Sequence, residues 1–205
     1  MKRLCTLLLL LSPAVGLSGQ VFTPDELAQA NTAAQAGYLS ESEREVVRYL
    51  NLARLNGPAF WAAYLAPRAA DYTRGTYYQT LKTTLRATRG LAVLQPDSLL
   101  SHAAAYHAAD MGASGGIGHT SSNGWAFDER LRALGVGTQT ALAENCHYGY
   151  DDPLAIVVDL LVDEGVESLG HRENILGAEY RFVGVAIRPH RDYRVNCVMD
   201  FAGAQ

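Results

Sequence analysis

Apolar residues recur at helical spacing in four stretches of the chain, and this pattern predicts four amphipathic helices. The first begins with Ser40 and Glu43, which have the spacing of a capping box, and Asn56-Gly57-Pro58 ends it. Further short helices are expected after Pro58 and in the stretch WAFDERLRALGV. The four inward faces are Val46, Val47, Leu50 and Ala53; Tyr77, Tyr78, Leu81 and Leu85; Leu100, Ala104, His107 and Met111; and Val157, Leu160, Leu161 and Glu164.

Two of these inward faces contain a polar residue. His107 is expected to be a core histidine with a local hydrogen-bond partner, whereas His102 on the same helix is expected to be solvated. Glu164 lies at the C-terminal end of the fourth helix, where the helix dipole disfavours a carboxylate. Its place on the inward stripe therefore needs an explanation.

Strand patterns are confined to the second half of the chain. Residues 141–149 form one short strand candidate. The runs RFVGVAI and YRVNCVMDFA flank a plausible turn, and alternate residues from Tyr193 to Phe201 fall on one face. Helices at the front and strands at the back, without regular βα alternation, predict an α+β domain whose helices cover a small antiparallel sheet.

The N-terminus has the pattern of a secretory signal peptide. Two basic residues precede an apolar run, a proline interrupts it, and small residues follow. We expect residues 1–19 to be this signal peptide, residues 20–38 to be a partly ordered leader arm, and residues 39–205 to form one domain. The alternative reading of the N-terminus is a buried helix.

Export changes how the cysteines are interpreted. Cys5 would leave with the signal peptide, and the two remaining cysteines, Cys146 and Cys197, are an even count in a compartment where disulfides persist. This indicates a disulfide, with two unpaired buried thiols as the alternative.

Charge and hydropathy narrow the set of partners. The formal charge is −4 and no basic stripe stands out, so nucleic acid is not expected as a partner. The N-terminal apolar run is too short to cross a bilayer, and no other segment is long enough to be transmembrane. We therefore expect a monomer that is secreted, periplasmic or held at the cell surface.

Four polar residues in separate segments suggest a common site. They are His119 in a Gly/Ser/Asn-rich loop, Glu144 in the short strand, Glu164 on the helical face, and His171 in the stretch GHRENIL. A carboxylate turned toward a core is costly unless it is paired or bound to something. Two histidines and two acids would satisfy one another or a divalent cation. The alternative is a hydrogen-bonded cluster that only holds the loop to the sheet.

The order of several motifs resembles that of the CAP superfamily. This group contains cysteine-rich secretory proteins, antigen-5-like allergens and plant pathogenesis-related proteins of the first class. The resemblance covers residues 40–203 and looks closest to the compact bacterial branch, which lacks the eukaryotic cysteine-rich extension. The stretches that carry it are GHTSSNGWAFDERL, AENC, VDLLVDEGVESLGHRENIL and VGVAI.

The resemblance implies an α-β-α sandwich whose open cleft holds a His-Glu-Glu-His tetrad. In this chain the four positions are His119, Glu144, Glu164 and His171. There are departures: Leu161 stands where tryptophan is common, and Ala143 where many members have glycine. Asp163 beside Glu164 leaves open which acid points into the cleft, although the helical stripe favours Glu164.

The resemblance also implies a ligand set. His119 and His171 would bind a divalent metal, with zinc expected, while Glu144 and Glu164 lie mostly behind these ligands and orient them. Asn145 and Asn174 are expected to be structural. In a sandwich of this kind the strands of Cys146 and Cys197 would be neighbours, within disulfide range.

Three functions are compatible with such a site. The first is a binding module for a small lipid, sterol or peptide. The second is a metal-dependent, peptidase-like hydrolase in which Glu144 or Glu164 acts as general base on a metal-bound water. The third is a cell-surface interaction protein. The motif HExxH does not occur, so the sequence favours binding over catalysis by a metal-dependent peptidase.

Overall fold

A four-stranded sheet forms the middle layer of the protein. The computed structural model describes residues 21–68, 75–137 and 141–204. The strands are ordered β1-β3-β4-β2, and β4 pairs antiparallel with both β3 and β2. The short β1 pairs parallel with β3, so the sheet is mixed rather than purely antiparallel. The bounds are β1 (Gln95–Pro96), β2 (Leu142–Tyr148), β3 (Tyr180–His190) and β4 (Arg194–Gly203).

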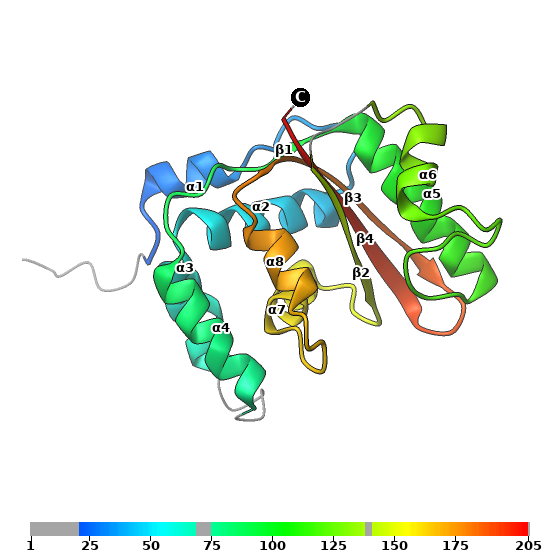
Figure 1. The fold of residues 1–205 in the computed structure, drawn as a ribbon. Coiled ribbons are helices and arrows are strands. Elements are labelled where there is room, and N and C mark those ends of the chain that lie inside the picture. The colour runs from blue at the N-terminus through cyan, green and yellow to red at the C-terminus, as the bar shows by residue number, and fades with distance from the viewer. Residues whose placement is uncertain (1–20, 69–74, 138–140, 205) are drawn as a thin grey trace, which may run out of the picture.

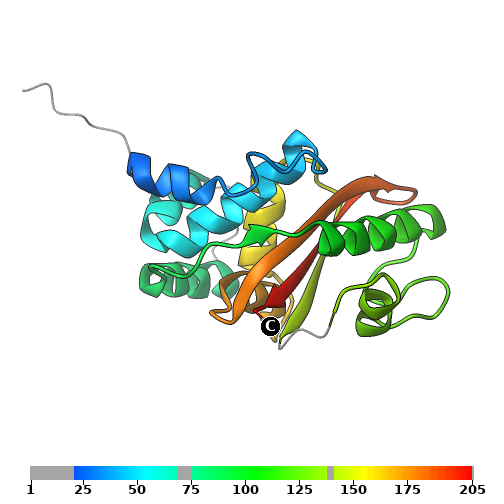
Figure 2. The ribbon, with the colours of Figure 1, turned by 90° about the horizontal axis from the view of Figure 1, so that it is seen from above.

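Helices cover both faces of this sheet, which confirms the predicted α-β-α sandwich (Figures 1 and 2). On one face lie α5 (Ser98–Ser114) and α6 (Phe127–Ala133). On the other lie α1 (Pro24–Ala30), α2 (Glu41–Leu55), α4 (Thr76–Ala87), α7 (Pro153–Val162) and α8 (Gly170–Leu176). Between α2 and α4, the short α3 (Gly57–Phe60) continues into a π-helical turn, Trp61–Leu65, and a 3-10 turn, Ala66–Arg68.

Side-chain caps mark the starts of three helices, and the first is the capping box that the sequence predicts. The Ser40 hydroxyl accepts the Glu43 amide, and the Glu43 carboxylate accepts the Ser40 amide, which completes the capping box of α2. Asp97 caps α5 through the Leu100 amide, and Asp152 caps α7 through the Ala155 amide. Local side-chain chemistry therefore sets where these helices begin.

The sheet divides the core in two. Alternate β4 residues, among them Met199 and Phe201, face the larger core against α2 and α7, as the alternation predicts. Val198 and Ala202 face the opposite way, toward α5. Helix α5 packs closely on the sheet because β3 has a glycine there: a Cβ on Gly184 would collide with the backbone of α5.

The segment expected to be a partly ordered leader arm is instead packed against the domain. Within residues 21–38, α1 carries its own capping box, and Phe22, Ala30 and Ala33 are buried. The buried Asn51 amide donates to the carbonyl oxygen of Ala30, which fastens the segment to α2. The sequence did not predict this packing, because alanines contribute little to the hydrophobic periodicity of a helix even where they are buried. The predicted signal peptide lies outside the described residues.

The predicted disulfide is wrong. Cys146 and Cys197 are both free and buried, although they lie on neighbouring strands. The register pairs Cys146 with Val198 and Cys197 with His147, an offset of one residue. Since successive side chains of a strand point to opposite faces, the two thiols face opposite sides of the sheet.

No helix in the described part of the chain is long and apolar enough to cross a membrane.

One buried arginine connects three elements of the larger core. Arg54 of α2 has no exposed surface, and its guanidinium donates to the carbonyl oxygens of Ile175 at 2.7 Å, Gly177 at 2.9 Å and Tyr180 at 3.2 Å. Burial lowers the pKa of Arg54 to about 10, which still leaves it charged at neutral pH. This side chain therefore satisfies the backbone where α8 ends and β3 begins.

We predict that Arg54→Met lowers the free energy of unfolding by about 3 kcal/mol, because it leaves several buried carbonyl oxygens without a donor. Arg48→Met on the same helix is the control: Arg48 makes a partly exposed ion pair with Glu45, worth under about 1 kcal/mol. Denaturant unfolding of both variants measures the difference. Losses of equal size would contradict the structural role of Arg54.

Candidate functional site

The loop that carries His119 is anchored from several sides. His107 of α5 is buried, and its Nε2 must carry the proton because it lies 2.9 Å from the Gly118 carbonyl oxygen, which can only accept. Tyr148 of β2 accepts the Gly118 amide through its hydroxyl. Burial lowers the pKa of His107, which keeps this ring neutral. His107 is thus the core histidine that its spacing predicts.

His119 forms a carboxylate–imidazole pair with Glu144. Its Nδ1 lies 2.9 Å from a Glu144 oxygen, and the other oxygen of that carboxylate accepts from Arg130 of α6. The side chains of Glu144 and Arg130 are buried, while that of His119 is 53% exposed. Since a carboxylate can only accept, Nδ1 carries the proton, and the Nε2 of a neutral His119 ring has a free lone pair. Burial raises the pKa of Glu144, but the hydrogen bond from His119 and the charge of Arg130 outweigh it, so the pKa lies below its usual value.

A second carboxyl group lies next to this pair. Asp200 on β4 is directly opposite Glu144 and is completely buried, and neither oxygen has a hydrogen-bond donor among the described residues. Burial and the neighbouring charge of Glu144 raise the pKa of Asp200 well above its usual value. The surroundings therefore favour the protonated form of Asp200, whose hydroxyl can donate to the Glu144 carboxylate.

His171 has an acid of its own, which is Asp163. Helix α7 ends at Val162, and Asp163 follows with a left-handed backbone, φ 59°. Its buried carboxylate accepts from the His171 Nδ1 at 2.7 Å and from the His171 amide at 3.0 Å. The imidazole is thus held in the same way as that of His119, with Nε2 left over.

Glu164 is placed differently from its prediction. The helical-stripe argument is wrong, because α7 ends two residues before Glu164, and this residue is exposed whereas Asp163 is 3% exposed. Glu164 nevertheless lines a cavity of about 240 Å³ together with Asp163 and His171. The two acids therefore have different positions: Asp163 is hydrogen-bonded to the His171 ring, and Glu164 borders the cavity.

Two asparagines connect the halves of the site. The Asn145 amide of β2 donates to the His171 carbonyl oxygen at 3.0 Å, and the Asn174 amide of α8 donates to the Asn145 side chain at 2.8 Å. Both are structural, as expected. They fix α8 against the edge strand β2, so His171 lies beside the strand that carries Glu144.

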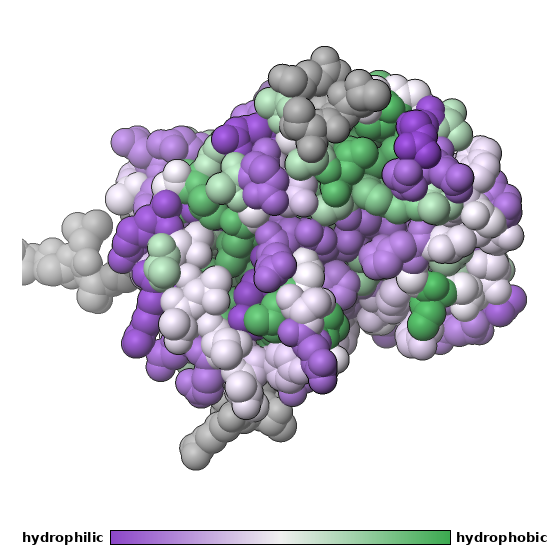
Figure 3. Space-filling view, in the orientation of Figure 1, coloured by the Kyte–Doolittle hydropathy of each residue, from purple (hydrophilic) through white to green (hydrophobic). Residues whose placement is uncertain are grey.

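No hydrogen bond or ion pair among the described residues joins His119 directly to His171. Cys146 lies between the two halves: its Sγ is 3.8 Å from the His119 Nδ1, and it lines the cavity that His171 lines. Figure 3 shows the face of the molecule that is turned to the viewer in Figure 1. Polar residues gather across the middle of that face, between α8 and α6.

Sequence reasoning missed several residues of this region. Arg130, Asp163 and Asp200 each bind or face a tetrad residue, and His147 pairs with Asp159 on the wall of the cavity at 3.0 Å. Of these, only Asp163 was singled out from the sequence, as the acid beside Glu164 that left the choice between the two open. The others depend on contacts between strands or between distant segments.

The donor set fits a divalent metal. Both tetrad imidazoles have Nδ1 bound to a carboxylate, and neither Nε2 has a hydrogen-bond partner in the described part of the chain. Metal-binding histidines are held in this way, because a second hydrogen bond fixes the tautomer and the ring orientation. Atoms of His107, Glu144 and Cys146 also lie within 4.8 Å of one another, but the Arg130 guanidinium on Glu144 opposes a cation among these three.

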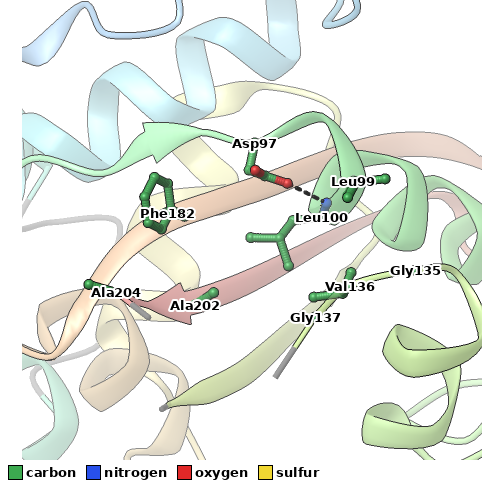
Figure 4. A pocket seen from close by; sticks show the side chains of 9 residues that line it. All are labelled: Asp97, Leu99, Leu100, Gly135, Val136, Gly137, Phe182, Ala202 and Ala204. Atoms are coloured by element: carbon green, nitrogen blue, oxygen red, sulfur yellow. Dashed lines mark hydrogen bonds between the residues drawn. The ribbon is translucent and has the colours of Figure 1, made fainter. Parts of the chain in front are cut away.

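A larger cavity, lined mostly by apolar side chains, lies elsewhere. It has a volume of about 570 Å³ and is lined by no tetrad residue. Figure 4 shows Leu99 and Leu100 of α5, Phe182 of β3 and Val136 around it. Its one acid, Asp97, is engaged in capping α5.

Comparisons with known proteins agree with this architecture. The sequence model described as the "Cysteine-rich secretory protein family" (CAP) matches residues 79–201, and a search of curated proteins finds no match. Among solved structures, the chain is similar to an extracellular protein containing an SCP domain from Bacillus anthracis, with a TM-score of 0.51 and 19% identity. That alignment covers 91% of this chain and 45% of the other, so the chain spans less than half of that protein's length.

Two further structures are similar at lower scores. An outer surface protein from Borrelia burgdorferi has a TM-score of 0.48 and 20% identity over 63% of this chain and 90% of that one. Venom allergen-like protein 4 from Schistosoma mansoni has a TM-score of 0.48 and 11% identity over 82% and 91%. Of the three, the Bacillus anthracis protein, at a TM-score of 0.51, supports the fold.

We predict opposite effects for the two facing carboxyl groups. Glu144→Gln should lower the free energy of unfolding by about 3 kcal/mol or more, because it leaves the Arg130 charge buried without its partner. Asp200→Asn should keep or raise stability at neutral pH, because an amide donates to Glu144 without having to hold a proton. Denaturant unfolding of chelator-treated protein measures both variants.

The pH dependence should also differ in sign. The pKa of Glu144 is lowered by folding, so its stabilisation is present above its ordinary value of 4.5 and is lost as pH falls through the folded value. The pKa of Asp200 is raised, so its cost develops as pH rises above 3.8, and the advantage of Asp200→Asn should grow from acid to neutral pH. A large loss of stability in Asp200→Asn at neutral pH would contradict a protonated Asp200.

Proposed function

The chain belongs to the cysteine-rich secretory protein family, and on that premise we propose that it is an exported binding module that holds a divalent metal through His119 and His171. The observation that supports this most directly is the shared arrangement of the two imidazoles, each with Nδ1 on a buried carboxylate and Nε2 left over. Nitrogen donors with nearby carboxylates suit zinc. The signal-peptide pattern of residues 1–19 supports export.

The chain's own residues would prepare the site for the metal. When bound, zinc would supply a Lewis acid with positions open to water or a ligand. Glu144 and Asp163 hold the protons at Nδ1 and orient the two rings, and Arg130 fixes Glu144 in turn. Glu164, on the cavity wall, adds negative charge near the cation.

We propose further that the apolar cavity takes a lipid or sterol rather than a peptide. Its volume of about 570 Å³ lies within the range of small-molecule sites. Its walls are mostly aliphatic and aromatic, and its single carboxylate is already bound to the Leu100 amide. A peptide backbone would find few hydrogen-bond partners there, whereas an acyl chain or a sterol needs none.

Hydrolysis has less support from the geometry. A general base must reach a water molecule, yet both Glu144 oxygens are engaged, by His119 and by Arg130, and the side chain is buried. Of the acids that line the neighbouring cavity, Asp159 is paired with His147 and Asp163 with His171, and no described contact orients Glu164. A binding role is therefore favoured over a metal-dependent hydrolase. A cell-surface interaction role rests on the export signal alone.

We predict that metal-free protein binds one zinc ion at about pH 7.5, and that His119→Ala and His171→Ala each abolish or strongly weaken binding. Affinity should fall toward about pH 5.5, because an imidazole must be neutral to bind a metal. Isothermal titration calorimetry on chelator-treated protein tests this. Absence of stoichiometric binding by the unmodified protein, or unchanged binding by both variants, would refute the metal site.

The neighbouring acids refine this experiment. Asp163→Asn should weaken zinc binding by roughly 10–100-fold, as expected for loss of the group that orients a ligating imidazole. Glu164→Gln should have a smaller effect, and Glu167→Gln, at an exposed position outside the cavity lining, serves as control. A larger effect of Glu164→Gln than of Asp163→Asn would reverse the roles given to the two acids.

The apolar cavity generates a separate prediction. Leu99→Lys should weaken binding of a fluorescent long-chain fatty acid about tenfold or more, because an ammonium group on the wall must be desolvated by the ligand. Ile117→Lys, also at an exposed apolar position but outside this cavity, is the matched control. Equal binding by the two variants, or no saturable binding by the unmodified chain, would count against a lipid site here.

A further inference from the structure

The outer edge of the sheet is formed by β2, which is the last strand in the sheet order and pairs only with β4. Backbone hydrogen bonds to β4 at Ala141 and Gly149 assign the odd-numbered residues between them to that ladder. Paired and unpaired positions alternate along an antiparallel strand. The backbone N–H and C=O groups of Glu144, Cys146 and Tyr148 therefore point away from the sheet.

Most of these outward groups have no partner in the part of the chain that the structure describes. The Glu144 carbonyl oxygen accepts from the Asn174 side chain, but at 3.4 Å this hydrogen bond is long. No described residue bonds to the backbone N–H or C=O of Cys146 or Tyr148. Unpaired groups along an edge strand are a template for a further strand.

The cavity of about 240 Å³ lies at this edge. It is lined by Cys146 and Tyr148, whose side chains lie on the α5 face of β2. It is also lined by His147, whose side chain points to the opposite face. A cavity that touches side chains on both faces of an edge strand extends around the edge itself. The unpaired backbone groups of Cys146 and Tyr148 therefore border this cavity.

The opposite wall of the cavity is acidic. Asp159, Asp163 and Glu164 line it, and its lining includes no lysine or arginine. The Asp159 side chain is 48% exposed and Glu164 is exposed, so both carboxylates are accessible to a ligand. The cavity is therefore complementary to a positively charged side chain.

We propose that an extended polypeptide segment adds to β2 as a further strand and places a lysine or arginine side chain in this cavity. This partner goes beyond the proposed metal and lipid, and its binding requires neither of them. Main-chain hydrogen bonds to Cys146 and Tyr148 would hold the segment, and the acidic cavity would select its basic side chain. Strand addition to a sheet edge divides affinity and specificity in this way.

The surroundings of the edge favour a single strand over the sheet of a second copy of this chain. The loop of His119 contacts β2 through Glu144, and α8 contacts it through Asn145. Figure 1 shows α7 and α8 on one side of β2 and α6 on the other. One extended segment reaches an edge flanked in this way more readily than another folded domain does.

Fluorescence anisotropy tests the proposal with the full chain in the presence of a chelator. The probe is a fluorescein-labelled hexapeptide of alternating valine and arginine, and it should bind saturably. A hexapeptide of alternating valine and glutamate should bind at least about tenfold more weakly, because the cavity repels its carboxylates. Glu164→Gln should weaken binding of the basic probe by up to about fivefold, as for a partly exposed ion pair. Glu167→Gln, outside the cavity lining, is the matched control.

N-methylated probes test the main-chain hydrogen bonds without altering the protein. Methyl groups on every residue block both hydrogen-bonding edges of the probe and should weaken binding by about tenfold or more. Methyl groups on every second residue leave one edge free, so binding should be kept. Equal binding of the unmodified and the fully methylated probe would show that the contact is not strand addition.

Amide hydrogen exchange measured by NMR locates the contact. In the free protein, the amides of Cys146 and Tyr148 should exchange at least about tenfold faster than those of Asn145 and His147, which bond to β4. The basic probe should slow the first pair and leave the second unchanged.

Three results would overturn the proposal. The first is the absence of saturable binding by the basic probe. The second is slow exchange of the Cys146 and Tyr148 amides in the free monomer, which would mean that the edge is closed. The third is a dimer, detected by analytical ultracentrifugation, whose formation protects these two amides and so assigns the edge to a second copy. The zinc and fatty-acid measurements are independent of all three.

Discussion

The buried ion pair between Arg130 and Glu144 is the interaction on which one half of the site depends. Arg130 comes from a short helix on one face, and Glu144 from the edge strand, and neither side chain is accessible to water. Because each charge would be costly without the other, the pair fixes α6 against the sheet. The same guanidinium donates to the His119 carbonyl oxygen, so the loop is held together with the helix.

The two halves of the site use the same device in different settings. In each, a carboxylate accepts a hydrogen bond from the Nδ1–H of an imidazole, which leaves Nε2 without a partner among the described residues. Glu144 lies on a strand, and the buried Arg130 balances its charge. Asp163 lies at the end of a helix, and the backbone amides of α8 donate to its carboxylate. Asn145 and Asn174 then fix the second half to the strand of the first. The result is a pair of pre-oriented nitrogen donors on either side of β2.

The polar site and the apolar cavity are lined by different residues. The tetrad region lies along β2, whereas the large cavity is formed by the start of α5 together with residues of β3 and β4. A metal and an apolar ligand would therefore bind at separate places, and the experiments on Leu99 and on the histidines can succeed or fail independently.

Local patterns in the sequence determined much of the fold. The caps at Ser40, Asp97 and Asp152 and the alternation along β4 act over a few residues, and each predicted element was found. Local composition and strand pattern also predicted the loop that carries His119 and the strand that carries Glu144. The roles of these residues as metal ligands and orienting acids stay predictions.

Only the tertiary structure decided the contacts between elements. Cys146 and Cys197 lie on paired strands, but a register offset of one residue puts them on opposite faces, and no local window encodes that register. Helix α7 ends two residues before the predicted stripe does, because Asp163 adopts a left-handed backbone. Asp163 accepts from the amide and the ring of His171, and Glu164 is left exposed. The position of Arg130 could not be predicted locally either. Its buried charge must be balanced by the Glu144 carboxylate, and the strand of Glu144 is held by a sheet whose other strands come from residues far along the chain.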